Sequence, residues 1–356
     1  MKNLLNTCWL TINRDCNIRC DFCYAQNKLF SKRETMSFEM AQSLIDIAIS
    51  NGVATFFLLG GEPTLHPAII DILSYITNRD RKIIVVTNGI KLQDVSFCEA
   101  ISRINQSQLI TIAIALKGSS NLEYKKLCGV PAYDKVLKAV ENCRKFNLKL
   151  NFSFVITSEN VYDLEQIANK LKNDGINETI SFSYCHDIII RNKFEILDKL
   201  HPIEIDSVFS DKYDYVDKVL GSNIAFHQTL PLCMCNKTMF DKMVLRKQIT
   251  TACQLQKKNS VIFDTDGGIL LCNHVNYCIG KYLEDFIDAE SFKKYWLSSK
   301  VEELFKRITT MPSRKCLNCK DRQLCGGGCC IQWFASDFES YNNYLLTIKS
   351  NLNGKD

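Results

Sequence analysis

The sequence predicts an α/β fold, a partial (β/α)6 TIM-like barrel followed by a small cysteine-rich C-terminal module. Short apolar runs alternate with helix-period segments through the first 190 residues, which is the order of a parallel sheet with crossover helices. After about residue 250, cysteines occur among Gly and Asp turns, as in a small module held by metal. The predicted domains are a barrel at 1–190, a bridging region at 191–250, the cysteine-rich module at 251–335 and a helical tail at 336–356.

Apolar, β-rich runs predict the strands of the barrel. Between them, the spacing of apolar residues predicts helices over 37–50, with Ser37 as N-cap, and over 133–146. Their regular alternation favours right-handed crossovers and a barrel over two separate domains. The predicted strands are 8–12, 55–59, 82–87, 109–115, 150–156 and 179–184.

Unusual residues follow the predicted strands. A cysteine cluster follows the first strand, "GGEP" (60–63) the second, "TNG" (87–89) the third and "KG" (117–118) the fourth. In a parallel sheet these loops meet at one edge, where catalytic and binding residues are usually found. We therefore expect a functional site at this edge.

Charge and composition exclude several classes of protein. Acidic and basic residues are mixed throughout, and a net charge of +5 over 356 residues indicates a solvated surface rather than a nucleic-acid footprint. The sequence has neither an export signal nor eighteen consecutive apolar residues, so we expect a cytoplasmic protein without a membrane span. In a compartment that keeps thiols reduced, its 18 cysteines favour metal or iron–sulfur ligation over disulfides.

The segment "CNIRCDFC" contains Cys16, Cys20 and Cys23 within one loop. Three thiolates can ligate three irons of a [4Fe–4S] cluster and leave the fourth iron open, whereas electron-transfer ferredoxins use four cysteines. Zinc would need a fourth ligand, and nothing local supplies one. The loop therefore predicts a cluster with a free coordination position.

The Cys-x3-Cys-x2-Cys spacing, with Phe22 before the last cysteine, resembles the signature of radical S-adenosylmethionine (radical SAM) enzymes. The resemblance implies that the open iron binds S-adenosylmethionine, which is cleaved to a 5′-deoxyadenosyl radical. It also implies that Gly60, Gly61 and Glu62 hold the amino group of the methionine. Further cofactor contacts are expected from Thr87, Asn88, Ser153 and Lys126, whereas the fourth strand reads Ala-Leu-Lys-Gly (115–118) where many relatives read Ser-Leu-Asp-Gly.

The C-terminal cysteines resemble the SPASM extension of radical SAM enzymes, which holds one or two auxiliary [4Fe–4S] clusters. The resemblance assigns a first auxiliary cluster to Cys253, Cys272 and Cys329. It assigns a second to Cys316, Cys319 and Cys325.

Each auxiliary cluster then needs a fourth ligand. Cys233 or Cys235 of "LPLCMC" is the candidate for the first. For the second, the alternatives are an open position, Asp337, Cys278, Cys330, or no cluster at all. A zinc module remains an alternative for this part of the chain, but it leaves the first loop unexplained.

Relatives with this extension mostly modify peptides or proteins. The resemblance therefore implies a crosslink, thioether or epimerisation on a ribosomally made peptide, with a reductant such as flavodoxin or ferredoxin. A leader peptide would be bound by the barrel mouth or by a partner protein. Sulfatase maturation is an alternative, although the Asp that serves as base there is replaced by Asn273, followed by His274. A non-catalytic iron–sulfur carrier or sensor is a second alternative, but it has no need of the "GGEP" segment.

Overall fold

The structure is a computed structural model that describes residues 4–25, 34–185, 188–190, 193–195, 198–221, 223–227, 230–250, 253, 257–308 and 314–329. The chain forms two compact units. The first comprises Met1–Ala115, Ser120–Asn151 and Lys257–Leu304, and the second comprises Leu116–Ser119, Phe152–Gln256 and Phe305–Asp356. The domain boundaries expected from the sequence stay a prediction, and the expected tail at 336–356 lies outside the described residues.

The first unit contains a mainly parallel sheet with the strand order β4-β3-β2-β1-β11-β12-β13. Strands β1 to β4 are parallel to one another, and β11 adds to the free side of β1 in the same direction. The two strands after β11 are antiparallel. The strands are β1 (Thr7–Asn13), β2 (Thr55–Gly60), β3 (Lys82–Thr87), β4 (Ile110–Leu116), β11 (Ser260–Phe263), β12 (Gly268–Cys272) and β13 (Val275–Lys281).

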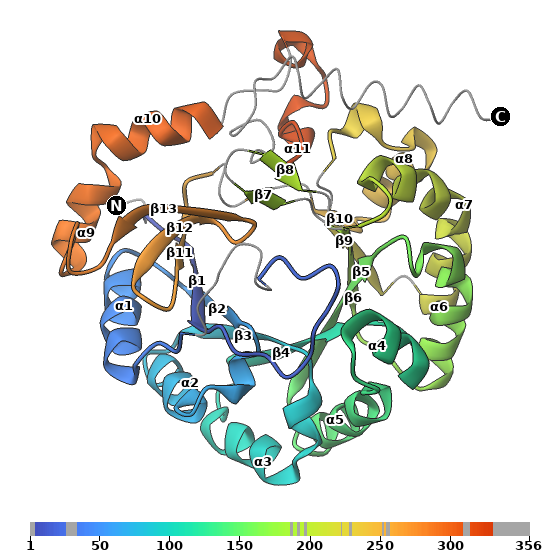
Figure 1. The fold of residues 1–356 in the computed structure, drawn as a ribbon, viewed down its shortest axis with the longest axis horizontal. Helices are drawn as coiled ribbons and strands as arrows, with labels where there is room; N and C mark the ends of the chain where they lie inside the picture. The colour runs from blue at the N-terminus through green and yellow to red at the C-terminus, as the bar shows by residue number, and fades with distance from the viewer. Residues whose placement is uncertain are drawn as a thin grey trace. The chain divides into compact units, whose positions relative to one another are not determined.

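Helices cover the outer side of these strands, and Figure 1 shows α1, α2, α3 and α5 lying outside β1–β4. Ser37 begins α1 as expected, because its hydroxyl accepts a hydrogen bond from the Met40 amide at 3.1 Å. The helices of this unit are α1 (Phe38–Ser50), α2 (Ile69–Thr77), α3 (Val95–Ile104), α4 (Asn121–Cys128), α5 (Tyr133–Lys145), α9 (Ala289–Trp296) and α10 (Ser299–Ile308), the last of which extends past the unit boundary.

The second unit has its own parallel strands, in the order β10-β9-β6-β5, and an antiparallel hairpin of β7 and β8. Its strands are β5 (Lys149–Ile156, which begins in the first unit), β6 (Ile180–Tyr184), β7 (Ile188–Ile190), β8 (Lys193–Glu195), β9 (Ile224–His227) and β10 (Ile249–Thr250). Its helices are α6 (Leu164–Asn173), α7 (Pro202–Leu220), α8 (Lys237–Leu245) and α11 (Arg322–Cys325), with a 3-10 turn at Arg314–Asn318.

Aromatic side chains fill the core between the long helix α7 and the strands of the second unit. Phe209 of α7 stacks on Phe226 of β9, with ring centroids 5.7 Å apart. Phe182 and Tyr184 of β6 pack against the same Phe209 ring. Such pairs contribute roughly 0.5–1.5 kcal/mol each beyond their buried area, so α7 is fixed to this sheet by ring packing.

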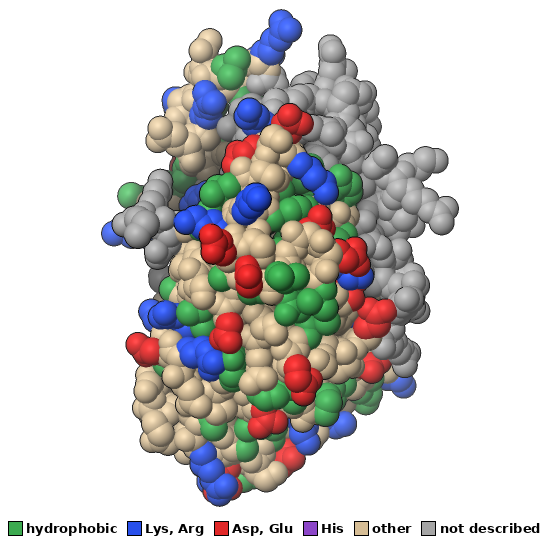
Figure 2. Space-filling view, turned by 90° about the vertical axis from the view of Figure 1, so that its left-hand side faces the viewer, with side chains coloured by type: hydrophobic (Ala, Val, Ile, Leu, Met, Phe, Trp, Pro, Cys, Tyr) green, Lys and Arg blue, Asp and Glu red, His purple; other side chains and the backbone are tan. Residues whose placement is uncertain are grey.

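The predicted α/β fold and its parallel strands are confirmed, and all six expected strands are present. Within the described part of the chain, no helix has the length and apolar character needed to span a bilayer. Figure 2 shows acidic and basic side chains interspersed over one face of the protein, without a large area of a single sign.

Candidate cofactor site

The cysteine loop follows β1 and is held by the C-terminal end of α4. The backbone amide of Arg19 donates to the Cys128 carbonyl at 2.9 Å, and that of Asp21 donates to the Leu127 carbonyl at 3.1 Å. The Cys23 amide turns back to the Cys20 carbonyl at 3.1 Å. These bonds give the loop a defined path over residues 16–23.

The glycines after β2 let that segment approach the start of the cysteine loop. The Gly61 amide donates to the Asn13 carbonyl at 2.9 Å, and the Glu62 amide donates to the Asp15 carbonyl at 2.6 Å. A Cβ atom at Gly60 would lie 2.3 Å from the carbonyl oxygen of Asn13, and one at Gly61 would lie 2.2 Å from that of Asp15. Only glycine permits this approach at either position.

The buried carboxylate of Glu62 organises the loops after β2 and β3. Its Oε1 accepts hydrogen bonds from the Thr64 amide and hydroxyl, at 3.1 and 2.7 Å, and from the Thr87 hydroxyl at 2.6 Å. Its Oε2 accepts one from the Asn88 amide at 2.7 Å. Burial raises the pKa of Glu62, and the hydrogen bonds from Asn88, Thr64 and Thr87 oppose that rise.

Asn88 connects this carboxylate to the cysteine loop. Its side-chain amide donates to Asn17 Oδ1 at 2.7 Å and lies 4.0 Å from Cys16 Sγ. The structure therefore brings together the residues expected after the first three strands, as parallel strand ends predict. Those residues are Cys16, Gly60, Gly61, Glu62, Thr87 and Asn88.

The donor set fits an iron–sulfur cluster. Burial raises the pKa of Cys16 to about 11, and the neighbouring Glu62, Cys20 and Cys23 add to this rise. With its pKa raised, the Cys16 thiol stays protonated at neutral pH, and a bound cation is what would ionise it. Among the described residues no three His, Cys, Asp or Glu side chains are already arranged as metal ligands, so the fit rests on donor chemistry and on the shared loop.

An acceptor beside the glycines also fits a cofactor. Asn13 Oδ1 is buried and has no hydrogen-bond partner among the described residues. A Cβ atom at Gly60 would lie 2.5 Å from it. A ligand with a donor, such as an ammonium group, would satisfy this oxygen.

The turn after β12 lies against the end of the cysteine loop. The His274 ring packs on the Tyr24 ring, with centroids 4.7 Å apart, and His274 Nδ1 is 3.9 Å from Cys272 Sγ. Burial raises the pKa of Tyr24, and negative charge on Cys23 and Cys272 adds to the rise. Asn273 Oδ1 is buried and has no hydrogen-bond partner in the part of the chain that the structure describes. His274, which follows Asn273, thus adjoins the end of the loop of the first cysteines.

The remaining predicted residues lie elsewhere in the two units. Lys126 is an exposed residue of α4, adjacent in sequence to Leu127, which holds the cysteine loop. Phe22 is half-buried within the cysteine loop, and Ser153 is half-buried on β5, in register with Ser181 of β6. The second unit contains Cys233, Cys235, Cys253, Cys316, Cys319, Cys325 and Cys329, whereas Cys272 and Cys278 belong to the first. Cys330 and Asp337 lie outside the described residues.

Several residues of the site could not be singled out from the sequence alone. Asn13, Asp15 and Asn17 meet the segments after β2 and β3 through backbone or amide groups, and Tyr24 meets His274. Their position after the first predicted strand was the available signal, because strand ends share one edge. Their hydrogen-bond and ring partners depend on how the strands pair, so they could not be predicted from the sequence.

The fold and this arrangement define a class of protein. Residues 10–171 match the Radical SAM superfamily. Over these residues, a little under half of the chain, it is similar to that superfamily, whose enzymes use S-adenosylmethionine together with an iron–sulfur cluster.

Particular relatives cover different shares of the chain. Fe-coproporphyrin III synthase of Methanosarcina barkeri is 27% identical over 167 residues, which is 46% of this chain and 40% of that protein. A cysteine-type anaerobic sulfatase-maturating enzyme of Clostridium perfringens is 22% identical over 332 residues, covering 88% of this chain and 85% of the relative. The chain thus spans less than half of the first relative and most of the second.

Solved structures share the fold. Streptococcus suis SuiB bound to S-adenosylmethionine superposes with a TM-score of 0.68 at 19% identity, over 92% of this chain and 73% of SuiB. SuiB bound to the precursor peptide SuiA gives a TM-score of 0.66, also at 19% identity, over 92% of this chain and 72% of SuiB. At this identity the likeness shows the fold alone.

Proposed function

We propose that this protein is a radical SAM enzyme with a SPASM-type C-terminal part that modifies a ribosomally made peptide. The observation that carries the proposal is the joining of the Cys16–Cys23 loop to the Gly-Gly-Glu segment through Glu62 and Asn88. An electron carrier would not need a Gly-Gly-Glu segment joined to the loop of its cluster. When bound, S-adenosylmethionine and a cluster reduced by an external electron donor would supply a 5′-deoxyadenosyl radical for hydrogen abstraction from the substrate.

The chain's own residues bind and orient the cofactor. Cys16, Cys20 and Cys23 would hold three irons and leave one position for the methionine part of S-adenosylmethionine. Among the described residues, Glu62 Oε2 accepts one hydrogen bond, so it can accept a second from the ammonium group. Its Oε1 is occupied by Thr64 and Thr87, which fixes the orientation of the carboxylate.

The test is the binding and cleavage of S-adenosylmethionine by Glu62→Gln. The new glutamine side chain would place an N–H group opposite the protein groups that now donate to the carboxylate. We therefore expect a roughly 10- to 100-fold loss of affinity for S-adenosylmethionine, as for the loss of hydrogen bonds to a charged group. Iron content should stay at the wild-type value. Dissociation constants come from equilibrium binding, and cleavage from the release of 5′-deoxyadenosine.

The matched control is Glu39→Gln on the exposed side of α1, which should behave as wild type. Unchanged affinity in Glu62→Gln, or an anaerobically reconstituted wild type that does not cleave S-adenosylmethionine, would contradict the proposal. A protein that contains only zinc would contradict it as well.

The proposed substrate is a peptide, and support comes from a structural neighbour solved with its precursor peptide. An electron donor such as flavodoxin or ferredoxin and a cytoplasmic location complete the proposal. Incubation with candidate precursor peptides, followed by mass spectrometry, identifies the substrate. A mass loss of two hydrogens would indicate a crosslink, and deuterium incorporation from solvent without a net change would indicate epimerisation.

A second candidate function is maturation of a sulfatase. It is favoured by the Clostridium perfringens relative, whose match covers 85% of that enzyme, and by His274, which lies beside the cysteine loop. Here His274 would accept the proton that Asn273 cannot accept. Conversion of a sulfatase-derived cysteine or serine peptide to its aldehyde, lost in His274→Gln, would select this function.

A further inference from the structure

Within the second unit, the segment containing Cys233 lies against Cys325. The backbone amide of Leu232, the residue before Cys233, donates to the sulfur of Cys325 at 3.3 Å. The two residues are 93 positions apart in sequence, so this is a tertiary contact. Amide donors commonly point at the sulfurs of cluster-ligating cysteines, where they tune the potential.

The segment 232–236 is anchored independently of any metal. Asp206 of α7 is buried, and its Oδ2 accepts a hydrogen bond from the Asn236 amide at 2.7 Å. Its Oδ1 accepts one from the Tyr184 hydroxyl, also at 2.7 Å. This fixes the backbone directly after Cys235.

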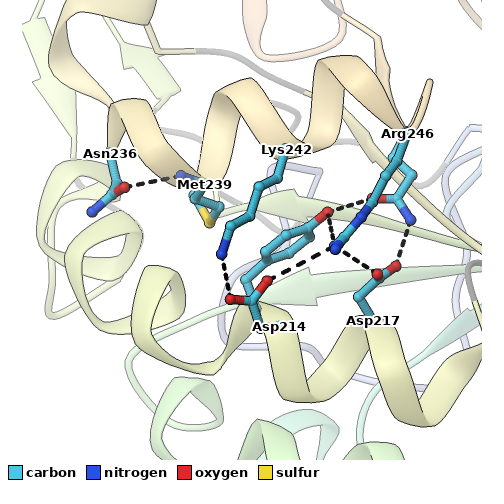
Figure 3. Close-up of polar contacts among 8 residues, drawn as sticks. Asp214, Asp217, Asn236, Met239, Lys242 and Arg246 are labelled. Carbon is cyan, nitrogen blue, oxygen red and sulfur yellow. Dashed lines mark hydrogen bonds and ion pairs between the residues drawn. The ribbon is translucent and has the colours of Figure 1, made fainter.

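Helix α8 itself is fixed to α7 by a polar cluster. Figure 3 shows Lys242 of α8 and Arg246, which directly follows this helix, reaching Asp214 and Asp217 of α7, and Asn236 capping α8 at Met239. The Arg246–Asp217 contact is 2.7 Å, and the Asn236 side chain accepts from the Met239 amide at 3.0 Å. The position of the segment before α8 is thus set by the fold.

The two cysteines of this segment differ in environment. Cys235 is 8% exposed, and its thiol donates to the Pro231 carbonyl at 3.5 Å, as a core cysteine does. Cys233 is exposed and directly follows the residue that contacts Cys325. Cys233 is therefore the one placed to share a metal with Cys325.

Cys316 and Cys319 belong to the same short stretch as Cys325. The Cys319 amide donates to the Cys316 carbonyl at 3.3 Å, and the Arg322 amide to the Cys319 carbonyl at 3.2 Å. A compact turn therefore carries these cysteines into α11. Three cysteines on one short stretch, and a fourth from an anchored neighbouring segment, is a donor set that closes a cluster.

We propose that Cys233 is the fourth ligand of the cluster held by Cys316, Cys319 and Cys325. It then does not ligate the other auxiliary cluster, which is assigned to Cys253, Cys272 and Cys329. This rests on the proposed function only in that the bound group is a [4Fe–4S] cluster. Four cysteine ligands leave no open iron, so this cluster transfers electrons and does not bind substrate. The Leu232 amide, which donates to Cys325 Sγ, would tune the potential of the bound cluster.

The first experiment uses the wild-type holoprotein, alkylated anaerobically with iodoacetamide and mapped by mass spectrometry. Cys233 and Cys319 are both exposed, so each serves as its own reference before and after the clusters are removed. We expect both to react at least tenfold more slowly in the holoprotein than after ferricyanide and EDTA remove the clusters. Rapid alkylation of Cys233 in a holoprotein whose Cys319 is protected would overturn the proposal.

The second experiment uses a parent in which Cys16, Cys20 and Cys23 are alanine, so that only auxiliary clusters remain. In this parent Cys233→Ser should change the electron paramagnetic resonance signal of the reduced protein in the same way as Cys319→Ser. Cys235→Ser should leave the signal unchanged. A Cys233→Ser signal identical to that of the parent, with Cys319→Ser altered, would overturn the proposal.

These outcomes are separate from the proposed function. Cleavage of S-adenosylmethionine is measured on the wild type and needs the first cysteine loop. Protection of Cys233 without cleavage would reject the enzyme proposal and leave the ligand assignment standing.

Discussion

At the scale of single residues, the site depends on the absence of a side chain at two glycines as well as on the side chain of Glu62. Gly60 and Gly61 have no Cβ, and this allows the strand-end backbone to contact Asn13 and Asp15. Glu62 then receives four hydrogen bonds from Thr64, Thr87 and Asn88. A carboxylate held by this many donors has a fixed orientation, which is what recognition of an ammonium group requires.

Gly61→Ala tests the close approach. The new methyl group would lie 2.2 Å from the Asp15 carbonyl oxygen, so the backbone must shift and the Glu62 amide must lose its bond to Asp15. We expect S-adenosylmethionine affinity to fall at least tenfold, measured by equilibrium binding.

Gly221→Ala is the control for the loss of a glycine. Gly221 ends α7 with a positive φ of 65° and has open space around its Cα. The alanine should lower the free energy of unfolding by about 1 kcal/mol without changing cofactor affinity. Equal affinity in Gly61→Ala and Gly221→Ala would show that the contact with Asp15 is dispensable.

Sequence reasoning reached the cysteines, the glycines and Glu62 because their spacing along the chain is itself the signal. It could not reach Asn17, whose importance comes from a 2.7 Å contact with Asn88, 71 positions away. An asparagine beside a cysteine has many roles, and only the meeting of two strand ends selects one. The same holds for Tyr24 and His274.

At the scale of elements, the stability of helix α7 depends on the protonation state of its N-cap residue, His201. Neutral His201 Nδ1 accepts a hydrogen bond from the Ile203 amide at 3.2 Å, while Glu204 accepts from the His201 amide at 2.8 Å. A protonated imidazole cannot accept that bond. Burial accordingly lowers the pKa of His201 to about 4.

The consequence is a stability that falls with acidification. The folded pKa of about 4 lies below the unfolded value near 6.5, so the contribution is full above pH 6.5 and is lost as pH falls toward 4. Its full size is about 3 kcal/mol. We expect the wild type to lose stability between pH 7.5 and 5.5 relative to His201→Asn, which retains a capping acceptor that does not titrate. If denaturant titrations give the same pH dependence of the free energy of unfolding for both proteins, the capping role of His201 is disproved.

The strand and helix elements differ in how visible they are in the sequence. The six strands stood out because they are continuous apolar runs bounded by polar residues, and the structure has all of them. For 191–250 the sequence predicts only a bridging region. In its described part it contains α7, β9, α8 and β10, and its apolar pattern is weak because charged residues such as Asp206 and Asp217 are buried in hydrogen-bonded pairs.

At the scale of the whole molecule, cofactor content is the quantity that follows from the proposals. Three [4Fe–4S] clusters correspond to about twelve irons per chain. Replacing Cys16, Cys20 and Cys23 by alanine should remove about four irons and abolish cleavage of S-adenosylmethionine, with the remaining iron unchanged. Iron and acid-labile sulfide are measured on anaerobic protein. A wild-type protein that contains four irons or fewer per chain would contradict the presence of auxiliary clusters.

The pairing of β1 with β11 could not have been predicted from local sequence. Residues 260–263 have no partner signal within reach, and the register of Thr7 with Ser260 is set only when both segments are present. An ion pair between Arg14 and Asp264, both with nearly buried side chains, joins the ends of these strands. The cysteine loop therefore depends on a segment some 250 positions later in the chain.

That pairing has a consequence for biosynthesis. One edge of β1 has no native partner until residues 260–263 have left the ribosome, which at 5–20 residues per second takes roughly 12 to 50 seconds after β1 itself emerges. An unpaired edge strand is a template for association with other chains. A nascent chain halted before residue 260 would display this edge, so we expect chaperone occupancy to rise on such chains and to fall once β11 is made.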